Sequence, residues 1–435
     1  MEQITKPHCG ARLDRLPDCR WHSSMFAIVA FGLLVCWSNA VGGLILAQLK
    51  ALGWTDNSTT ATFSAITTAG MFLGALVGGI IGDKTGRRNA FILYEAIHIA
   101  SMVVGAFSPN MDFLIACRFV MGVGLGALLV TLFAGFTEYM PGRNRGTWSS
   151  RVSFIGNWSY PLCSLIAMGL TPLISAEWNW RVQLLIPAIL SLIATALAWR
   201  YFPESPRWLE SRGRYQEAEK VMRSIEEGVI RQTGKPLPPV VIADDGKAPQ
   251  AVPYSALLTG VLLKRVILGS CVLIAMNVVQ YTLINWLPTI FMTQGINLKD
   301  SIVLNTMSMF GAPFGIFIAM LVMDKIPRKT MGVGLLILIA VLGYIYSLQT
   351  SMLLITLIGF FLITFVYMYV CYASAVYVPE IWPTEAKLRG SGLANAVGRI
   401  SGIAAPYAVA VLLSSYGVTG VFILLGAGDA ANLLI

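Results

Sequence analysis

Residues 80–89 read IIGDKTGRRN, and this short stretch decides the fold because it interrupts two long apolar runs. Asp83, Lys84, Arg87 and Arg88 bring charge to it, and the neighbouring glycines favour a tight turn. Apolar segments that stop so briefly, and with an excess of basic charge, are typical of two membrane-spanning helices joined by a cytoplasmic hairpin.

The composition extends this interpretation to the whole chain. Its 435 residues are 56% hydrophobic and 12% charged, whereas soluble domains carry about 25% charged residues. A spanning helix needs about 20 mostly apolar residues, and in lipid its backbone must satisfy its own hydrogen bonds. The sequence therefore predicts an all-α membrane protein with twelve transmembrane helices, at about 25–47, 62–82, 90–108, 112–136, 152–174, 182–202, 265–291, 302–323, 331–349, 352–377, 391–413 and 417–435.

The net charge of +9 reflects membrane topology. With the N-terminus in the cytoplasm, the cytoplasmic segments hold 25 Lys and Arg residues and the opposite side only 3, which is a strong positive-inside bias. This placement excludes a nucleic-acid partner and predicts a multi-pass protein of the cytoplasmic (inner) membrane. The first span is too long for a cleavable signal, and no small-residue cleavage site follows it.

The charged stretch recurs once, at a constant offset. Asp83, Lys84, Arg87 and Arg88 reappear 241 residues later as Asp324, Lys325, Arg328 and Lys329, and the preceding stripe of small residues (Gly70, Gly74, Gly78) reappears as Gly311, Gly315 and Ala319. Two pseudo-symmetric six-helix bundles follow, and repeated halves of this kind are typical of secondary transporters. The predicted division is a cytoplasmic segment (1–24), a first bundle (25–202), a cytoplasmic linker (203–264) and a second bundle (265–435).

Four motifs together resemble one family. They are Gly79-x-x-x-Asp83-Lys84-x-Gly86-Arg87-Arg88, Arg118-x-x-x-Gly122-x-Gly124-x-Gly126, PESPRW at 203–208, and PEIWPTEAKLRGSG at 379–392 followed by GRISG at 398–402. The chain resembles the major facilitator superfamily over essentially its whole length. Within it, the motifs are similar to those of the sugar-porter-like metabolite–proton symporters of the nicotinate and aromatic-acid type.

The resemblance implies that the charged loops act as gates. Asp83 is expected at the start of the eleventh helix near 390–391, Arg87 and Arg88 are expected to reach Glu138, and Arg328 is expected to reach Glu380. The alternative is that these charges only set topology. The full set of predicted gating residues is Gly79, Asp83, Gly86, Arg87, Arg88, Glu138, Arg145, Glu204, Arg207, Asp324, Arg328, Glu380, Arg389 and Arg399.

Arg118 lies inside the fourth span, where a charge is a functional hypothesis by default. In the symporters that the chain resembles, this arginine pairs with an aspartate of helix 1, but here Ser38 and Asn39 occupy that position. Either Arg118 binds an anionic substrate directly, or Glu95 or Asp429 carries the coupling proton. Glu95 has His98 on the same helix face, but helix rise places it about 10–15 Å from Arg118 along the membrane normal, too far for a direct pair.

Polar and aromatic residues inside the spans indicate where a substrate could bind. Amides and hydroxyls can orient a ligand while aromatic rings cover its apolar part, although some of these residues could equally be packed amides or interfacial aromatics. Gln280 follows Asn39 by the same 241 residues, so the two could face each other. The predicted substrate-binding residues are Asn39, Arg118, Asn157, Trp158, Asn277, Gln280, Tyr281, Asn285, Trp286, Tyr369 and Tyr372.

The sequence thus predicts a secondary transporter for a small organic solute, an organic or aromatic carboxylate rather than a neutral sugar, driven by protons. The alternatives are a sugar facilitator or symporter and a non-transporting sensor. We expect no enzyme activity, metal or cofactor, since the seven cysteines form no ligand cluster and the GVGLG run at 122–126 lies within a helix. A monomer in contact with lipid is expected. The last span ends with Ile435, so a shortened C-terminus is also an expectation.

Overall fold

The computed structural model describes residues 7–17, 19–141, 145–240, 254–293, 295–323, 325–349, 351–382 and 386–433. Within these ranges only the backbone is described at 133, 134, 137, 145, 146, 254, 293, 387–389, 418, 419 and 421–433. Asp324, one of the predicted gating residues, therefore lies outside the described residues. The same holds for the side chains of Arg145, Arg389 and Asp429.

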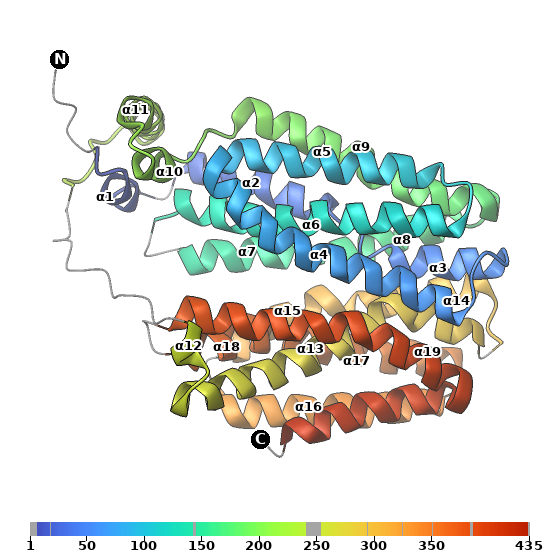
Figure 1. Cartoon of the computed structure of the whole chain (residues 1–435). Helices are drawn as coiled ribbons and strands as arrows, with labels where there is room; N and C mark the ends of the chain where they lie inside the picture. Colours follow the sequence, from blue (N-terminus) through green and yellow to red (C-terminus); the bar gives the residue numbers. More distant parts are fainter. Residues whose placement is uncertain are drawn as a thin grey trace.

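Two groups of helices, one from each half of the sequence, lie side by side (Figure 1). The first half contains α2 (Arg20–Val35), α3 (Gly42–Ala51), α4 (Asn57–Thr85), α5 (Arg87–Ala106), α6 (Met111–Tyr139), α7 (Arg145–Asn157), α8 (Ser159–Leu170) and α9 (Ala176–Tyr201). The second half contains α13 (Gly260–Thr293), α14 (Leu298–Met309), α15 (Gly311–Val322), α16 (Arg328–Ser347), α17 (Met352–Cys371), the π-helix η1 (Tyr372–Tyr377), α18 (Val378–Glu380) and α19 (Lys387–Leu433). The predicted all-α membrane fold is confirmed.

Nine helical segments of the described chain are long and apolar enough to cross a membrane. The other three predicted spans coincide with interrupted helices. The first is split into α2 and α3 at 36–41, the fifth into α7 and α8 at Trp158, and the twelfth follows a kink in α19 at Gly417, where φ is +65°. In Figure 1 α19 turns back on itself at this kink.

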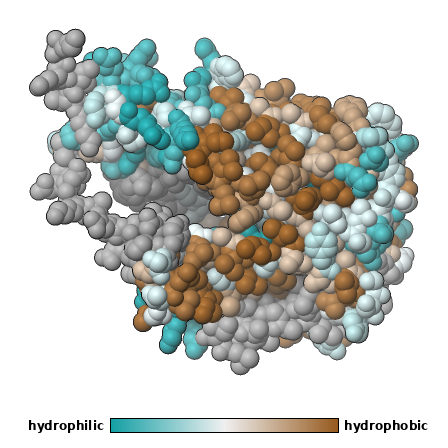
Figure 2. Space-filling view, viewed as in Figure 1, coloured by the Kyte–Doolittle hydropathy of each residue, from teal (hydrophilic) through white to brown (hydrophobic). Residues whose placement is uncertain are grey.

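The outer face of the bundle is apolar, as a lipid-facing surface must be. Large side chains such as Ile80 (61% exposed) and Leu353 (68% exposed) point outward from membrane-length helices. In Figure 2 a hydrophobic band covers the middle of the molecule, and hydrophilic residues gather at its two ends.

Side chains at helix starts define where several helices begin. Asp56 accepts a hydrogen bond from the amide of Thr59 (2.7 Å) and Asn110 from that of Phe113 (2.9 Å), the usual N-cap geometry.

Three short helices form a layer at one end of the first half: α1 (Cys9–Asp14), α10 (Pro206–Ser211) and α11 (Tyr215–Thr233). The sequence predicts a helical patch at α11 but neither α1 nor α10. The apolar face of α11 packs on Leu13, Leu16 and Leu209. Glu226 of α11 accepts hydrogen bonds from Arg12 (2.6 and 3.0 Å) and Arg15 (2.7 Å), which ties α1 to α11. The fourth short helix, α12 (Tyr254–Leu257), contacts the second half.

The closest helix packing lies between α4 and α6 and depends on glycine. A methyl group on Gly70 or Gly74 would clash with the backbone carbonyl oxygens of Phe119 and Val123, and one on Gly126 would clash with that of Met71. The GVGLG run therefore packs helices together, as predicted from its position. The repeated stripe of small residues in the second half also packs helices together, because Gly311 and Gly315 lie against the backbone of α17. Small residues let helix backbones approach closely in membranes.

The α4–α6 contact predicts different outcomes for two glycines of one helix. In Gly74→Ala the new methyl group would meet the Val123 backbone, whereas Gly79→Ala would meet no atom within 4 Å. We expect Gly74→Ala to lower the free energy of unfolding by about 1–3 kcal/mol, as overpacking does, and Gly79→Ala to leave it unchanged or raise it by up to about 1 kcal/mol, since alanine favours a helix over glycine. Thermal unfolding in detergent measures both, and equal melting temperatures would contradict the packing described here.

The α1–α11 contact predicts a pH dependence. Burial raises the pKa of Glu226, but hydrogen bonds from Arg12 and Arg15 outweigh it and hold this pKa below its ordinary value. The stabilisation is therefore present above the ordinary glutamate pKa of about 4.3 and is lost as pH falls through the lowered value. We expect hydrogen exchange in residues 9–14 to stay slow from about pH 8 to 5 after correction for the intrinsic rate. Glu226→Gln should accelerate it across that range, and an unchanged rate would show that apolar packing alone holds α1.

Candidate functional site

The break in the first transmembrane segment exposes backbone groups inside the protein. Residues 36–41 leave the helical conformation between α2 and α3, so the carbonyl of Ser38 is free to accept a hydrogen bond from a side chain. Ser38 is completely buried, while the side chain of Asn39 is half-buried. This turn is where the sequence departs from the symporter pattern.

Arg118, two turns into α6, points at this turn. Its Nη1 donates a hydrogen bond to the carbonyl oxygen of Ser38 (2.6 Å), and its Nε donates to Oγ1 of Thr67 (3.2 Å). The guanidinium carbon lies 4.6 Å from the centre of the Phe63 ring, a cation–π contact. Arg118 is 1% exposed, and no carboxylate among the described side chains lies within ion-pair distance of it. Its charge is thus solvated by neutral groups only.

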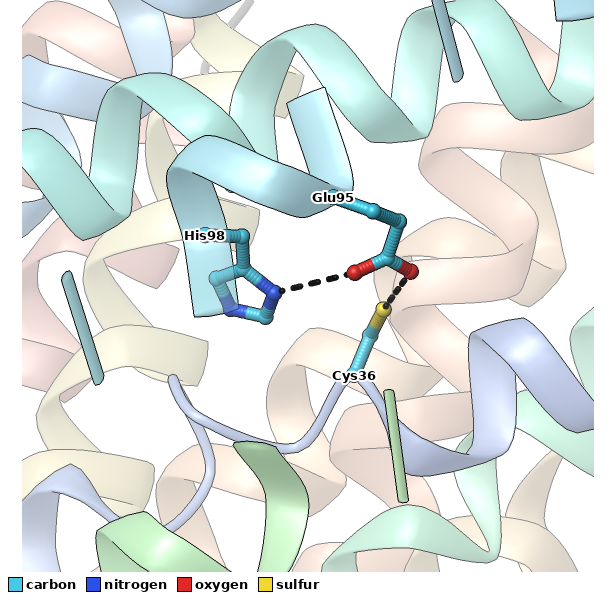
Figure 3. A group of neighbouring side chains, drawn as sticks. All are labelled: Cys36, Glu95 and His98. Carbon is cyan, nitrogen blue, oxygen red and sulfur yellow. Dashed lines mark hydrogen bonds and ion pairs between the residues drawn. The ribbon is translucent and has the colours of Figure 1, made fainter. Parts of the chain in front are cut away.

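Glu95 and His98 of α5 approach the same turn from the other side. Oε2 of Glu95 lies 3.6 Å from Nδ1 of His98, and Sγ of Cys36 donates to Oε1 of Glu95 at 3.7 Å (Figure 3). Nε2 of His98 lies 2.7 Å from Oγ of Ser38, a hydrogen bond whose direction depends on the tautomer. Glu95 and His98 are completely buried. Glu95 does not touch Arg118 directly, as helix rise predicts, but Ser38 contacts both His98 and Arg118.

The same three side chains are the one group in the described part of the chain whose donor atoms could hold a metal ion. The thiol, carboxylate and imidazole donors of Cys36, Glu95 and His98 lie within 4.8 Å of one another. Chemically the group can bind one or two protons or a soft divalent cation. The sequence analysis found no ligand cluster because these residues are 59 and 62 positions apart and meet only in the fold.

A third element, α13 of the second half, closes over Arg118. A Cβ atom on Gly42 would lie 2.9 Å from Nη2 of Arg118, which is a clash, and 3.4 Å from Oδ1 of Asn285, so these two polar groups pack closely around Gly42. Gly43 lies against the backbone carbonyls of Ile284 and Asn285. The two halves therefore meet here, one turn beyond the predicted approach of Asn39 and Gln280.

Other predicted substrate residues of α13 lie along the same helix. Asn277 is buried and donates to the carbonyl of Leu273 (2.7 Å). Gln280 is half-buried. Tyr281 packs beside Gly402 of α19, next to Thr68 of α4. These residues thus follow the surface between the halves.

The remaining predicted substrate residues lie away from Arg118. Trp286 is buried in an apolar cluster with Ala61 and Val409. Tyr372 packs on Gly332 of α16, and Tyr369 reaches the carbonyl of Val272 (3.4 Å). At the break between α7 and α8, Asn157 donates to Ser153 (2.8 Å), and Trp158 meets Phe310 at the break between α14 and α15.

In the first half, the predicted contact of the charged loop with Glu138 is present. Nε and Nη2 of Arg87 both lie 2.9 Å from Oε1 of Glu138, and Nη1 lies 2.7 Å from Asp83. Two expectations were wrong. Arg88 donates to the carbonyl of Trp199 (2.6 Å) instead of Glu138. The Asp83 carboxylate is 64% exposed and pairs with Arg87 instead of capping the eleventh helix, because the ion pairs at this end stay within each half.

Glu204 ties the segment after α9 to the start of α5. Its Oε1 accepts hydrogen bonds from the amides of Arg87 (2.7 Å) and Arg88 (3.3 Å), which places a negative charge at a helix N-terminus. Gly86 has φ of +98°, and any side chain there would collide with the Glu204 carboxylate. The predicted gating residue Arg207 binds Asp14 (2.9 Å) in α1.

The second half repeats the first with fewer contacts. Nε of Arg328 lies 2.9 Å from Oε2 of Glu380, as predicted, and its Nη1 donates to the carbonyl of Met323. Arg399 is half-buried in α19 and has no ion-pair partner among the side chains that the structure describes. A gating role for these residues stays a prediction.

The halves are bonded to each other at the end opposite to these ion pairs. Asn305 of α14 donates to Oγ of Ser164 (3.2 Å), and Oγ1 of Thr306 donates to the carbonyl of Ser164 (3.2 Å). The Arg87–Glu138 and Arg328–Glu380 pairs each stay within one half. The molecule is therefore joined across its halves at the α3–α8–α14 end, which positive-inside topology predicts to be the periplasmic end.

Burial predicts unequal strengths for the Arg87–Glu138 and Arg328–Glu380 ion pairs. The side chains of Arg87 and Glu138 are 17% and 20% exposed, against 30% and 49% for Arg328 and Glu380. We expect a double-mutant cycle with Gln substitutions to give a coupling above about 1 kcal/mol for the first pair and below it for the second, since water screens the more exposed pair. Thermal unfolding of the four variants of each pair measures both couplings, and a stronger second pair would refute this ranking.

Comparisons with known proteins agree with this architecture. Residues 25–406 match the Major Facilitator Superfamily. The chain is 44% identical to the inner membrane metabolite transport protein YdjE of Escherichia coli, covering 98% of this chain and 94% of YdjE. It is 25% identical to the niacin transporter NiaP of Acinetobacter baylyi, covering 93% and 90%. A partially occluded inward-open structure of the E. coli xylose transporter XylE superposes with a TM-score of 0.74 at 17% identity, covering 95% and 97%. The protein is a multi-pass membrane transporter and belongs to the Major Facilitator Superfamily.

Proposed function

We propose that this protein carries a small organic anion across the cytoplasmic membrane by alternating access, and that Arg118 is the group that binds the anion. One observation carries the proposal. Arg118 is buried between the halves with no carboxylate partner among the described residues, although helix 1 supplies one in the symporters that the sequence resembles.

The energetics favour a substrate as the missing partner. A buried charge without an ionic partner costs several kcal/mol. Neutral acceptors occupy Nε and Nη1 of Arg118, and Nη2 lies beside Gly42 and Asn285. A carboxylate that reaches Nη2 when the halves separate would gain charge-assisted hydrogen bonds, with the amide of Asn285 beside it. The Phe63 ring nearby suits an aromatic or otherwise planar acid.

The surface between the halves offers contacts for the rest of the molecule. Gln280 and Tyr281 of α13 lie along it, opposite Thr68 of α4. Arg118 is inaccessible in this arrangement, so binding requires the halves to separate on one side. The hydrogen bonds at Ser164 close one end, and we assign the closing of the opposite end to the segment containing Asp83 and Arg87.

The relatives support an organic solute and leave its class open. One relative is a niacin transporter, and niacin carries a carboxylate. The solved neighbours transport xylose, which is neutral, but at 17% identity they speak for the fold alone. A neutral sugar is the competing substrate, and the experiment below distinguishes the two.

Ligand binding to the purified protein tests the anion site. We expect aromatic and aliphatic carboxylates, screened in a panel with sugars and organic cations, to raise the melting temperature by mass action. Arg118→Gln should weaken the binding of the best acid at least tenfold, since a charge-assisted hydrogen bond contributes about 1.5–3 kcal/mol. Arg200→Gln, which removes an exposed charge at the end of α9, is the matched control.

Two results would overturn the proposal. Stabilisation by sugars and not by acids would establish the neutral-solute alternative. Stabilisation by acids that persists unchanged in Arg118→Gln would place the anion site elsewhere and leave Arg118 with a structural role. The melting temperature of each variant without ligand separates loss of binding from loss of folding.

A further inference from the structure

We propose that Glu95 and His98 form the ion-coupling site of this transporter, where one proton binds between the Glu95 carboxylate and Nδ1 of His98. Ser38 then links the occupancy of this site to Arg118. The proposal rests on the proposed function, because it explains how anion binding at Arg118 is driven. In the symporters that the sequence resembles, the coupling acid lies in the first transmembrane segment, whereas we place the coupling site on a pair of residues in the third.

The geometry of the pair indicates a missing cation. Oε2 of Glu95 and Nδ1 of His98 are buried, face each other at 3.6 Å, and have no hydrogen-bond partner. This separation is too long for a hydrogen bond. When the ring proton of neutral His98 lies on Nε2, facing Ser38, Nδ1 and Oε2 are two acceptors without partners, and their proximity is unfavourable. A proton on Nδ1 turns the contact into an imidazolium–carboxylate pair and satisfies both atoms. Cys36 already donates to the other oxygen.

Charge counting shows why protonation would favour anion binding. With Glu95 ionised and His98 neutral, the pair carries −1 and Arg118 carries +1, so the buried group is neutral. Adding one proton to Nδ1 makes the group +1. A monovalent organic anion then restores neutrality. The two ligands enter together because either one alone leaves a net charge in a buried site, which is costly.

Ser38 provides the physical link. Its Oγ lies 2.7 Å from Nε2 of His98, and its carbonyl accepts a hydrogen bond from Nη1 of Arg118 at 2.6 Å. When Nδ1 is bare, the ring proton of neutral His98 lies on Nε2 and already donates to Oγ; the proton gained by Nδ1 turns this contact into a stronger, charge-assisted hydrogen bond. The residue that responds therefore belongs to the break between α2 and α3 at 36–41, directly before the glycines that contact α13.

Few other charges face the pair. The first segment brings the Cys36 thiol, and α6 brings Arg118 through Ser38. The remaining charged residues of the packed helices lie at helix ends: Asp83 and Lys84 in α4, Asp112 and Glu138 in α6, and Glu177, Arg181 and Arg200 in α9. Proton binding at this site is therefore governed by Glu95, His98, Cys36 and Arg118.

A soft metal ion is the competing occupant, since Cys36, Glu95 and His98 could ligate one. The proton is favoured for two reasons. A divalent ion would have to displace the thiol proton of Cys36 beside the Glu95 carboxylate, whose negative charge disfavours the thiolate. A single added charge is what one monovalent anion can balance, whereas a divalent ion with a neutral thiol would leave the buried group at +2.

A proton titration without substrate gives the first test. We expect infrared difference spectra of the reconstituted protein, recorded against pH, to show imidazolium and carboxyl bands that vanish in Glu95→Gln and in His98→Gln. Ser38→Ala should keep these bands but shift their midpoint, since it removes the contact at Nε2. This measurement does not depend on the identity of the substrate, so its failure is distinct from failure of the anion site.

Transport in liposomes gives the second test, with radiolabelled nicotinate or the panel acid that stabilises the protein most. Wild type should accumulate the acid under an inward proton gradient and ignore a potassium-diffusion potential, because one proton and one monovalent anion move together. Glu95→Gln and His98→Gln should lose accumulation at least tenfold yet keep counterflow exchange within about twofold, which also shows that they fold. The control Cys117→Ser, outside the site, should accumulate normally.

Three outcomes would overturn the proposal. Proton-driven accumulation that survives Glu95→Gln or His98→Gln places the coupling proton elsewhere. Unchanged infrared titrations in those variants show that the pair does not bind it. Stoichiometric binding of cobalt(II) with a thiolate charge-transfer band that is lost in Cys36→Ser, but kept in Cys117→Ser, identifies the site as a metal site.

Discussion

The hydrogen bond from Arg118 to the carbonyl of Ser38 is the interaction on which the centre of this protein depends. A guanidinium within the membrane needs strong acceptors, and the carbonyls of an intact helix each accept a backbone hydrogen bond already. Breaking the first transmembrane segment at 36–41 frees a carbonyl for this purpose. The hydrogen bond to this freed carbonyl offsets part of the cost of burying the Arg118 charge. The helix break and the buried charge therefore depend on each other.

The packing of the surrounding helices is adapted to this arrangement. Glycine lets α4 and α6 pack backbone to backbone, which holds Thr67 and Arg118 in register from two helices. Because Gly42 and Gly43 lack side chains, α13 of the second half can reach the same point. The polar centre and the contact between the halves therefore coincide, as alternating access requires, while the ion pairs at the loop end stabilise each half separately.

The features that could be predicted from the sequence are its internal repeat and its strongly patterned apolar and charged segments. Apolar length predicted the spans, the offset of 241 residues predicted the two halves, and the charged loops predicted the Arg87–Glu138 and Arg328–Glu380 pairs. It could not predict the helix breaks, since CWSNAV has no proline and reads as part of an apolar run. The Cys36–Glu95–His98 group was missed for a related reason: it forms only because the chain bends at that break. The signal that could have found it was two adjacent polar residues, Ser38 and Asn39, inside a span.

The layer of α1, α10 and α11 belongs to one half of the transporter only. Trp208 and Arg212 both donate to the carbonyl of Asp83 (2.7 and 2.6 Å), and Glu204 holds the start of α5. Any rotation of the first half relative to the second therefore moves α11 with it outside the membrane, while α12 stays with the second half. A partner or modification that engages α11 could bias the transport cycle without approaching the substrate path.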